Sequence, residues 1–143
     1  MKYERTVFEN DTIVNAAEVL NKFDAALHEL YAEVNGHTVW ENESPTTAFA
    51  AQSIVIEPEK VPTHYEVQFM RTTSAQYMST TGKIPIANHA DLTANGGAAR
   101  YRAVKVTQDS EAGTITFAFT TGYSGTTAGT GHCIPVAIKL YYV

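Results

Sequence analysis

The sequence predicts a mainly β protein, in which an antiparallel β-sandwich or jelly-roll-like domain follows one N-terminal α-helix that forms a coiled coil in an oligomer. Apolar residues keep a helical spacing over residues 13–34, whereas apolar and polar residues alternate with period two across residues 48–143. Turn sequences rich in glycine separate short strands, and the helices needed between parallel strands are missing. We therefore expect a leader and oligomerisation helix (1–36), a linker (37–47) and a β-sandwich domain (48–143).

The helix is predicted by spacings that alternate between three and four residues, which is the a/d pattern of a coiled coil. Asn15 can cap it, with Glu18 three residues later, and Gly36 supplies a natural end. The expected oligomer interface consists of Ile13, Ala16, Leu20, Phe23, Leu27, Leu30 and Val34.

The same periodicity also fits an amphipathic helix that packs on its own β-domain. Ala17, Val19 and Ala26 flank the a/d positions and widen the apolar face, as in a bundle or in a helix lying on another surface. A helix this short is marginal alone in water. It needs a partner, which is either further copies of itself or the following domain.

The linker ends in the polar sequence ENESPTT, which contains Pro45. After it, strands are expected at 53–57, 65–70, 75–79, 83–87, 101–107, 114–120 and 134–143. Pro85 and Pro135 fall inside two of these segments, and proline cannot donate to a strand ladder. These two positions should therefore be edges, bulges or strand ends.

Composition argues against several classes of partner. The formal net charge is -5, and Arg100 and Arg102 are the nearest approach to a basic cluster, so no nucleic acid is expected. The sequence has no signal-peptide pattern and no run of about 20 apolar residues, so no membrane partner is expected. Cys133 is the single cysteine, which fits synthesis in a reducing cytoplasm.

No catalytic, metal or cofactor motif stands out, and we expect a protein that is not an enzyme and uses no cofactor. The histidines form neither an HExxH motif nor a close pair. His132 and Cys133 are adjacent, so in a strand they point to opposite faces. The glycine-rich segment 122–131 matches no nucleotide-binding motif and reads as a mobile loop or hairpin tip.

Three aromatic residues, Trp40, Tyr77 and Tyr123, are candidate ligand contacts because they lie near predicted loops or strand ends. Exposed aromatic rings can stack on sugars or anchor protein interfaces. The alternative is that the tyrosines are half-buried sheet residues and that Trp40 packs the helix against the β-domain.

Two stretches resemble proteins of bacteriophage virions. The sequence TIVNAAEVLNKFDAAL at residues 12–27 is similar to the opening of many tail, neck and baseplate appendage proteins. Residues 65–143, with YEVQFMR, YMSTTGKIPI, RYRAVKV and IPVAIKLYY, resemble a small β-domain of virion proteins.

The resemblance implies a homotrimer in which three helices form a short coil and the β-domains are displayed on the virion for assembly or host-surface binding. The number three comes from the resemblance alone. We expect a phage or prophage virion protein, made in the bacterial host cytoplasm, whose residues 1–12 dock on other virion proteins. The alternative is a stand-alone carbohydrate-binding β-sandwich that binds a glycan, on a host surface for example, through the loops around Tyr77 and Tyr123.

Overall fold

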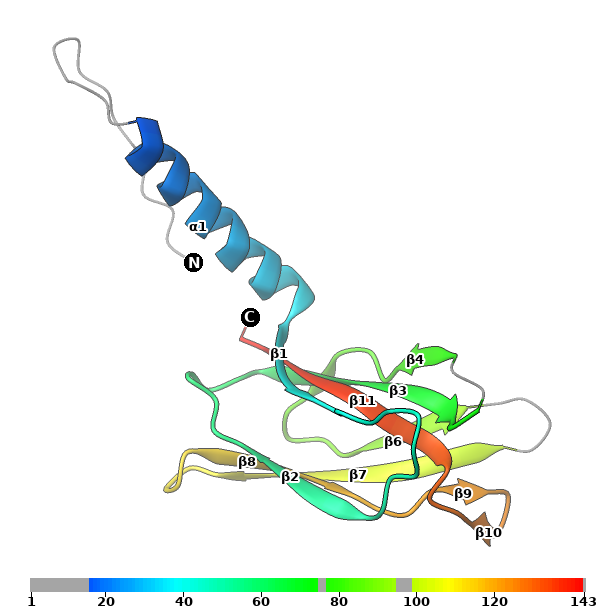
Figure 1. The fold of residues 1–143 in the computed structure, drawn as a ribbon. Coiled ribbons are helices and arrows are strands. Elements are labelled where there is room, and N and C mark those ends of the chain that lie inside the picture. Colours follow the sequence, from blue (N-terminus) through cyan, green and yellow to red (C-terminus); the bar gives the residue numbers. More distant parts are fainter. Residues whose placement is uncertain (1–15, 75–76, 95–98, 143) are drawn as a thin grey trace, which may run out of the picture.

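The computed structural model describes residues 16–74, 77–94 and 99–142. Helix α1 (Ala16–Asn35) comes first and extends away from a β-domain made of two antiparallel sheets (Figure 1). The predicted class, mainly β with one N-terminal helix, is confirmed.

The first sheet contains the longest strands and has the order β1-β11-β3-β4, with β5 also paired to β3. Its strands are β1 (His37–Glu41), β3 (His64–Thr72), β4 (Met78–Thr80), β5 (Ile84–Pro85) and β11 (His132–Tyr141). Because β11 pairs with β1 on one side and β3 on the other, the last strand of the described chain lies inside its sheet.

The second sheet has the order β10-β9-β7-β8-β2, with β6 also paired to β7. Its strands are β2 (Gln52–Ile56), β6 (Ala90–Ala94), β7 (Arg100–Asp109), β8 (Thr114–Phe119), β9 (Tyr123–Ser124) and β10 (Thr127–Ala128). In Figure 1 this sheet is the lower layer, and no described helix or strand lies below it.

The core fills the space between the two sheets. Along β8, Ile115, Phe117 and Phe119 are buried while their neighbours are half exposed, as the period-two pattern predicts. Further buried side chains are Tyr65, Val67, Phe69, Leu92, Val104, Ile134, Ile138 and Leu140. Each large apolar side chain removed from water contributes roughly 1.5–3 kcal/mol, so this layer supplies most of the stabilisation.

The linker prediction is wrong for its first five residues, because His37–Glu41 form strand β1. This segment pairs with β11, about a hundred residues later, and a partner so distant leaves no local signal. Strand β6 was also not predicted. The expected strands at 75–79 and 83–87 shrink to β4 and β5, with 75–76 outside the described residues.

Both prolines lie where a missing N–H donor is tolerated, as predicted. Pro85 ends the two-residue strand β5, and Pro135 stands at a bulge where the register with β3 shifts.

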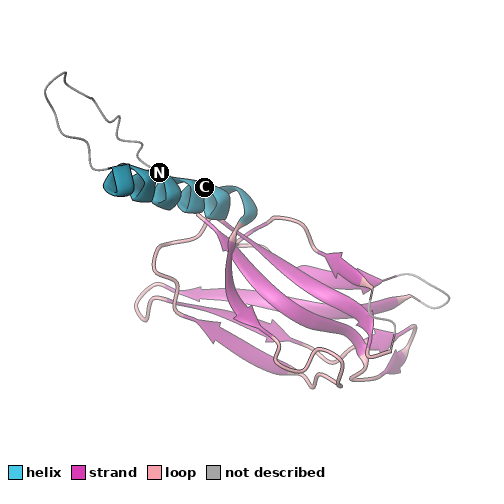
Figure 2. Cartoon of the chain, turned by 45° about the horizontal axis from the view of Figure 1, so that its top comes forward, coloured by secondary structure: helices cyan, strands magenta, loops and turns pink. Residues whose placement is uncertain are grey.

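Helix α1 ends at Asn35 and is followed by Gly36, whose φ of +80° is a left-handed conformation that favours glycine. The chain then enters β1 directly, and α1 points away from both sheets (Figures 1 and 2). The alternative in which α1 packs on its own β-domain is therefore wrong for this chain. Trp40 also does not join α1 to the domain, since its ring contacts Phe49 and Phe119 in the core.

Candidate association surface and surface pockets

An apolar stripe runs along the exposed side of α1 and consists of Leu20, Phe23, Leu27, Leu30 and Val34. The exposed fraction of these side chains ranges from 43% at Leu30 to 65% at Leu20 and Val34. Of the other predicted interface residues, Ala16 is the first residue of α1, and Ile13 lies outside the described residues.

Exposure of so many large apolar side chains on one helix is unusual for a helix that is stable in water. Helices in proteins are stabilised mainly by packing of their apolar face rather than by intrinsic helix propensity. Contiguous exposed apolar surface marks a site of interaction. The stripe is therefore a candidate association surface.

The sides of the stripe carry few charges that could select a partner. Asp24 lies beside the stripe, and its carboxylate Oδ1 is 3.8 Å from His28 Nε2 one turn later, with both side chains well exposed. An exposed pair of this kind contributes little to helix stability. Recognition along α1 would depend on apolar packing.

The junction between α1 and β1 packs against the C-terminal end of β11. A Cβ atom at Gly36 would lie 2.9 Å from the ring of Tyr141, so glycine is required by space as well as by backbone angle. Lys83 Nζ lies 4.3 Å from the centroid of the same ring, and the rings of His37 and Tyr142 meet edge to face at 5.1 Å. These contacts fix the point from which α1 leaves the domain.

The three predicted ligand-binding aromatics are not brought together by any contact within the described part of the chain. Trp40 is half-buried against core rings, 6.2 Å from Phe49 and 6.5 Å from Phe119 between centroids. Tyr77 is 73% exposed and precedes β4 of the first sheet. Tyr123 lies in β9 of the second sheet, where its ring stacks on Tyr101 at 5.1 Å.

Sequence reasoning did not single out Tyr101, which is 38% exposed on the second sheet. The available signal was the alternation in β7, where Arg102, Val104 and Val106 are buried. Residues between them, including Tyr101, must then lie on the outer face.

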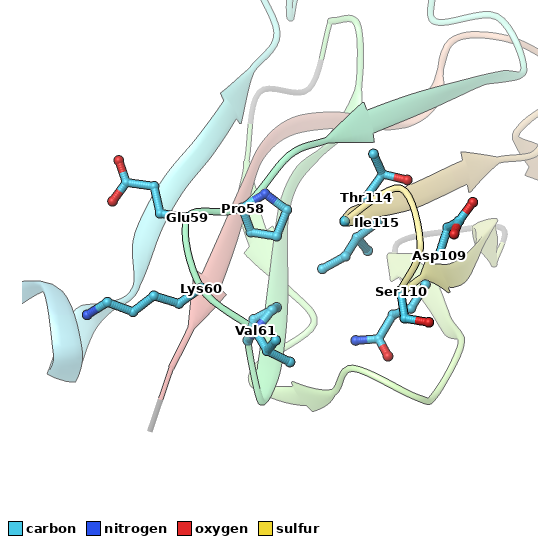
Figure 3. Close-up of a pocket in the computed structure, with 11 residues that line it drawn as sticks. Pro58, Glu59, Lys60, Val61, Asp109, Ser110, Thr114 and Ile115 are labelled. Carbon is cyan, nitrogen blue, oxygen red and sulfur yellow. The ribbon is translucent and has the colours of Figure 1, made fainter.

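One pocket of about 270 Å³ opens between the loop that connects β2 to β3 and the β7–β8 hairpin (Figure 3). Pro58, Val61 and Ile115 provide its apolar wall, whereas Glu59 and Lys60 extend away from it. The carboxylate Oδ1 of Asp109 accepts hydrogen bonds from the backbone N–H groups of Glu111 and Ala112, so it holds the hairpin turn. The pocket offers apolar contact rather than a pair of acidic groups.

The most polar cluster in the interior surrounds Arg102, which is fully buried between the sheets. Its guanidinium donates to the carbonyl oxygens of Thr120 (2.6 Å), Cys133 (2.9 Å), His132 (2.9 Å) and Thr130 (3.2 Å). Burial lowers the pKa of Arg102 to about 10. Arg100 and Arg102 therefore do not form a basic surface patch, because the side chain of Arg102 is buried and joins the two sheets.

His132 and Cys133 are part of this cluster. Cys133 is buried with a φ of +47°, a conformation that lets its carbonyl group turn toward Arg102. Burial raises the pKa of the Cys133 thiol to about 11, which keeps the sulfur protonated and weakly nucleophilic. Burial, together with the charges of Arg100 and Arg102, lowers the pKa of His132.

The described residues contain no group of three or more His, Cys, Asp or Glu side chains placed to hold a metal ion. Helix α1 is not apolar enough over its length to cross a membrane.

Comparison of the chain with protein-family models, with curated proteins and with solved structures gives no match.

Proposed function

We propose that this protein is a structural appendage of a phage or prophage virion, which assembles as a homotrimer through the apolar stripe of α1 and displays its β-domains for assembly or host-surface binding. The observation that carries the proposal is the exposed stripe on a helix that leaves its own domain. The resemblance of residues 12–27 and 65–143 to virion proteins supports the proposed place of this protein in a virion. The proposed role is architectural and not catalytic.

Further copies of the same chain suit the stripe better than an unrelated surface. Its residues recur at alternating intervals of three and four, which is the spacing that keeps apolar side chains facing each other between supercoiled helices. A helix of 20 residues is about 30 Å long, enough for a short coil. Three surface sites held in one assembly bind a repeated target far more tightly than one site does.

The N-terminal segment provides the attachment in this proposal. Residues 1–12 contain Tyr3, Val7 and Phe8 among polar residues and precede the coil. They would dock on another virion protein after synthesis in the bacterial cytoplasm, while the β-domains point outward.

The test is the molar mass measured by light scattering for the intact protein and for two double variants. Leu20→Asp with Leu27→Asp places two carboxylates in the stripe, and we expect a monomer because their burial would be too costly. Asn21→Asp with Ala25→Asp adds the same two charges at exposed positions outside the stripe, and we expect a trimer. A monomeric intact protein, or loss of association in both variants, would contradict the proposal.

A further inference from the structure

The outer face of the second sheet carries a shallow depression that the assembly role does not use. It has a volume of about 450 Å³ and lies over Ala103, between β6, β7 and the end of β8. His89, Asp91, Lys105 and Thr120 also line it. No described helix or strand covers this face in Figure 1.

The floor of the depression is small, and an aromatic side chain stands next to it on the same strand. Tyr101, Ala103 and Lys105 are alternate residues of β7, so their side chains stand on the same face, about 7 Å apart along the strand. Tyr101 stacks on Tyr123 with an angle of 12° between the ring planes. Tyr123 therefore covers one face of the Tyr101 ring, while Tyr101 keeps 38% of its surface in contact with solvent.

The polar walls present both donors and acceptors. Asp91 pairs with Ala103 across the ladder and supplies carboxylate acceptors, while Lys105 supplies an ammonium donor. His89 Nδ1 accepts a hydrogen bond from the backbone N–H of Val106 (3.0 Å). The neutral imidazole therefore carries its proton on Nε2, which adds a second donor.

We propose that this depression is a binding site for a neutral pyranose sugar. An apolar ring face can stack on Tyr101, and hydroxyl groups can both donate to Asp91 and accept from Lys105 or His89. Opposite charges on the two walls favour a hydroxyl-rich neutral ligand over an ion of either sign. Ala103 leaves the space that the sugar ring occupies.

This location differs from the one expected from the sequence, because Tyr77 and Trp40 take no part. The inference also does not depend on association through α1, since all of its residues belong to one β-domain. The monomeric variant Leu20→Asp with Leu27→Asp should therefore bind as the intact chain does, at the level of a single site.

The experiment titrates the full chain with the methyl glycosides of glucose, galactose, mannose and N-acetylglucosamine and follows backbone amide signals by NMR. We expect at least one glycoside to give saturable shifts centred on Asp91, Ala103 and Lys105, with a dissociation constant on the order of millimolar. Tyr101→Ala should weaken this binding about tenfold. Ala103→Leu should abolish it by filling the floor.

Matched variants separate the site from effects on folding. Thr107→Leu enlarges an exposed residue on the same face of the same strand, and Tyr77→Ala removes an exposed tyrosine elsewhere, so both should bind normally. Asp91→Asn keeps the size of an exposed side chain and should weaken binding if the carboxylate accepts from the sugar. The absence of saturable shifts with all four glycosides, or shifts that persist in Ala103→Leu, would overturn the inference.

Discussion

Arg102 is an interior cation whose hydrogen-bond partners are carbonyl groups of the backbone. It belongs to β7, while its acceptors follow β8 at Thr120 or belong to the segment 130–133 that enters β11. Its guanidinium carbon lies over the ring of Phe49, 5.3 Å from the ring centroid, so an aromatic side chain packs against this cation. One side chain therefore satisfies acceptors from two sheets, a task that suits the planar fork of arginine.

Replacing Arg102 should destabilise the fold. In Arg102→Met the apolar stem is retained, but the carbonyl groups lose their charged donor, and we expect a loss of roughly 3 kcal/mol in the free energy of unfolding. Urea denaturation gives the value. Lys105→Met, on the exposed face of the same strand, is the control and should change stability by about 0.5 kcal/mol or less. Equal midpoints for both variants would show that Arg102 is not needed.

The cluster around Arg102 could not be predicted from the sequence because its acceptors are backbone atoms. Their residues lie between 18 and 31 positions from Arg102, and any residue type supplies a carbonyl group. By contrast, the alternation of buried and exposed residues in β8 depends on side-chain type and was predictable. Tyr101 was missed for a related reason, because the charged residue Arg102 stands at a buried position and breaks the apolar alternation that Val104 and Val106 continue.

At the scale of elements, the glycine-rich segment 122–131 is a packed hairpin and not a mobile loop. Strands β9 and β10 pair within it, and the N–H of Gly129 donates to the carbonyl oxygen of Gly122 (2.8 Å). A Cβ atom at Gly122 would lie 2.6 Å from the carbonyl oxygen of His132 and 2.8 Å from that of Gly129. The glycines allow the hairpin to lie close against the start of β11.

Gly122→Ala should therefore destabilise the protein by about 2 kcal/mol, because backbone atoms must move to admit the methyl group. Thermal unfolding followed by circular dichroism measures the change. Gly131→Ala belongs to the same segment, but its added Cβ would be 3.7 Å from Thr73 Oγ1, an ordinary contact. If Gly131→Ala lowers the melting temperature as much as Gly122→Ala, close packing at Gly122 is not the cause.

The elements themselves were predictable to different degrees. The long alternating strands β3, β7, β8 and β11 were predicted near their bounds because each carries enough buried side chains to show its period. Strand β1 was assigned to the linker because five residues beside a helix end carry little pattern, and pairing with β11 decides their structure. Strand β6 is also short, and its Asp91 is a weak strand former.

For the whole molecule, the sequence predicted one helix before a β-domain but left open where the helix lies. Periodicity identifies the apolar face of a helix and says nothing about which surface covers that face. The arrangement is decided at Gly36, where the left-handed backbone and the ring of Tyr141 direct α1 away from the sheets. The stripe is thereby left open to other molecules.

The direction in which copies of α1 align determines where the β-domains gather. In a parallel coil all three domains lie at the same end, as the proposed appendage requires, whereas antiparallel helices would separate them. Leu27→Cys places a thiol in the stripe, and the native Cys133 is fully buried and does not compete. Parallel helices bring the thiols of two copies within disulfide distance, so mild oxidation should yield a covalent dimer on a non-reducing gel.

Ala25→Cys is the control, because position 25 lies outside the stripe and parallel copies keep it apart. Light scattering under reducing conditions confirms that both variants still associate. Efficient cross-linking at position 27 together with weak cross-linking at position 25 shows that the stripes of two copies face each other. Parallel copies give this result, and so do antiparallel copies if the coil is centred at position 27. Centring is tested by Leu20→Cys, which lies two helical turns earlier: parallel copies should cross-link at both positions, and antiparallel copies at one of them at most.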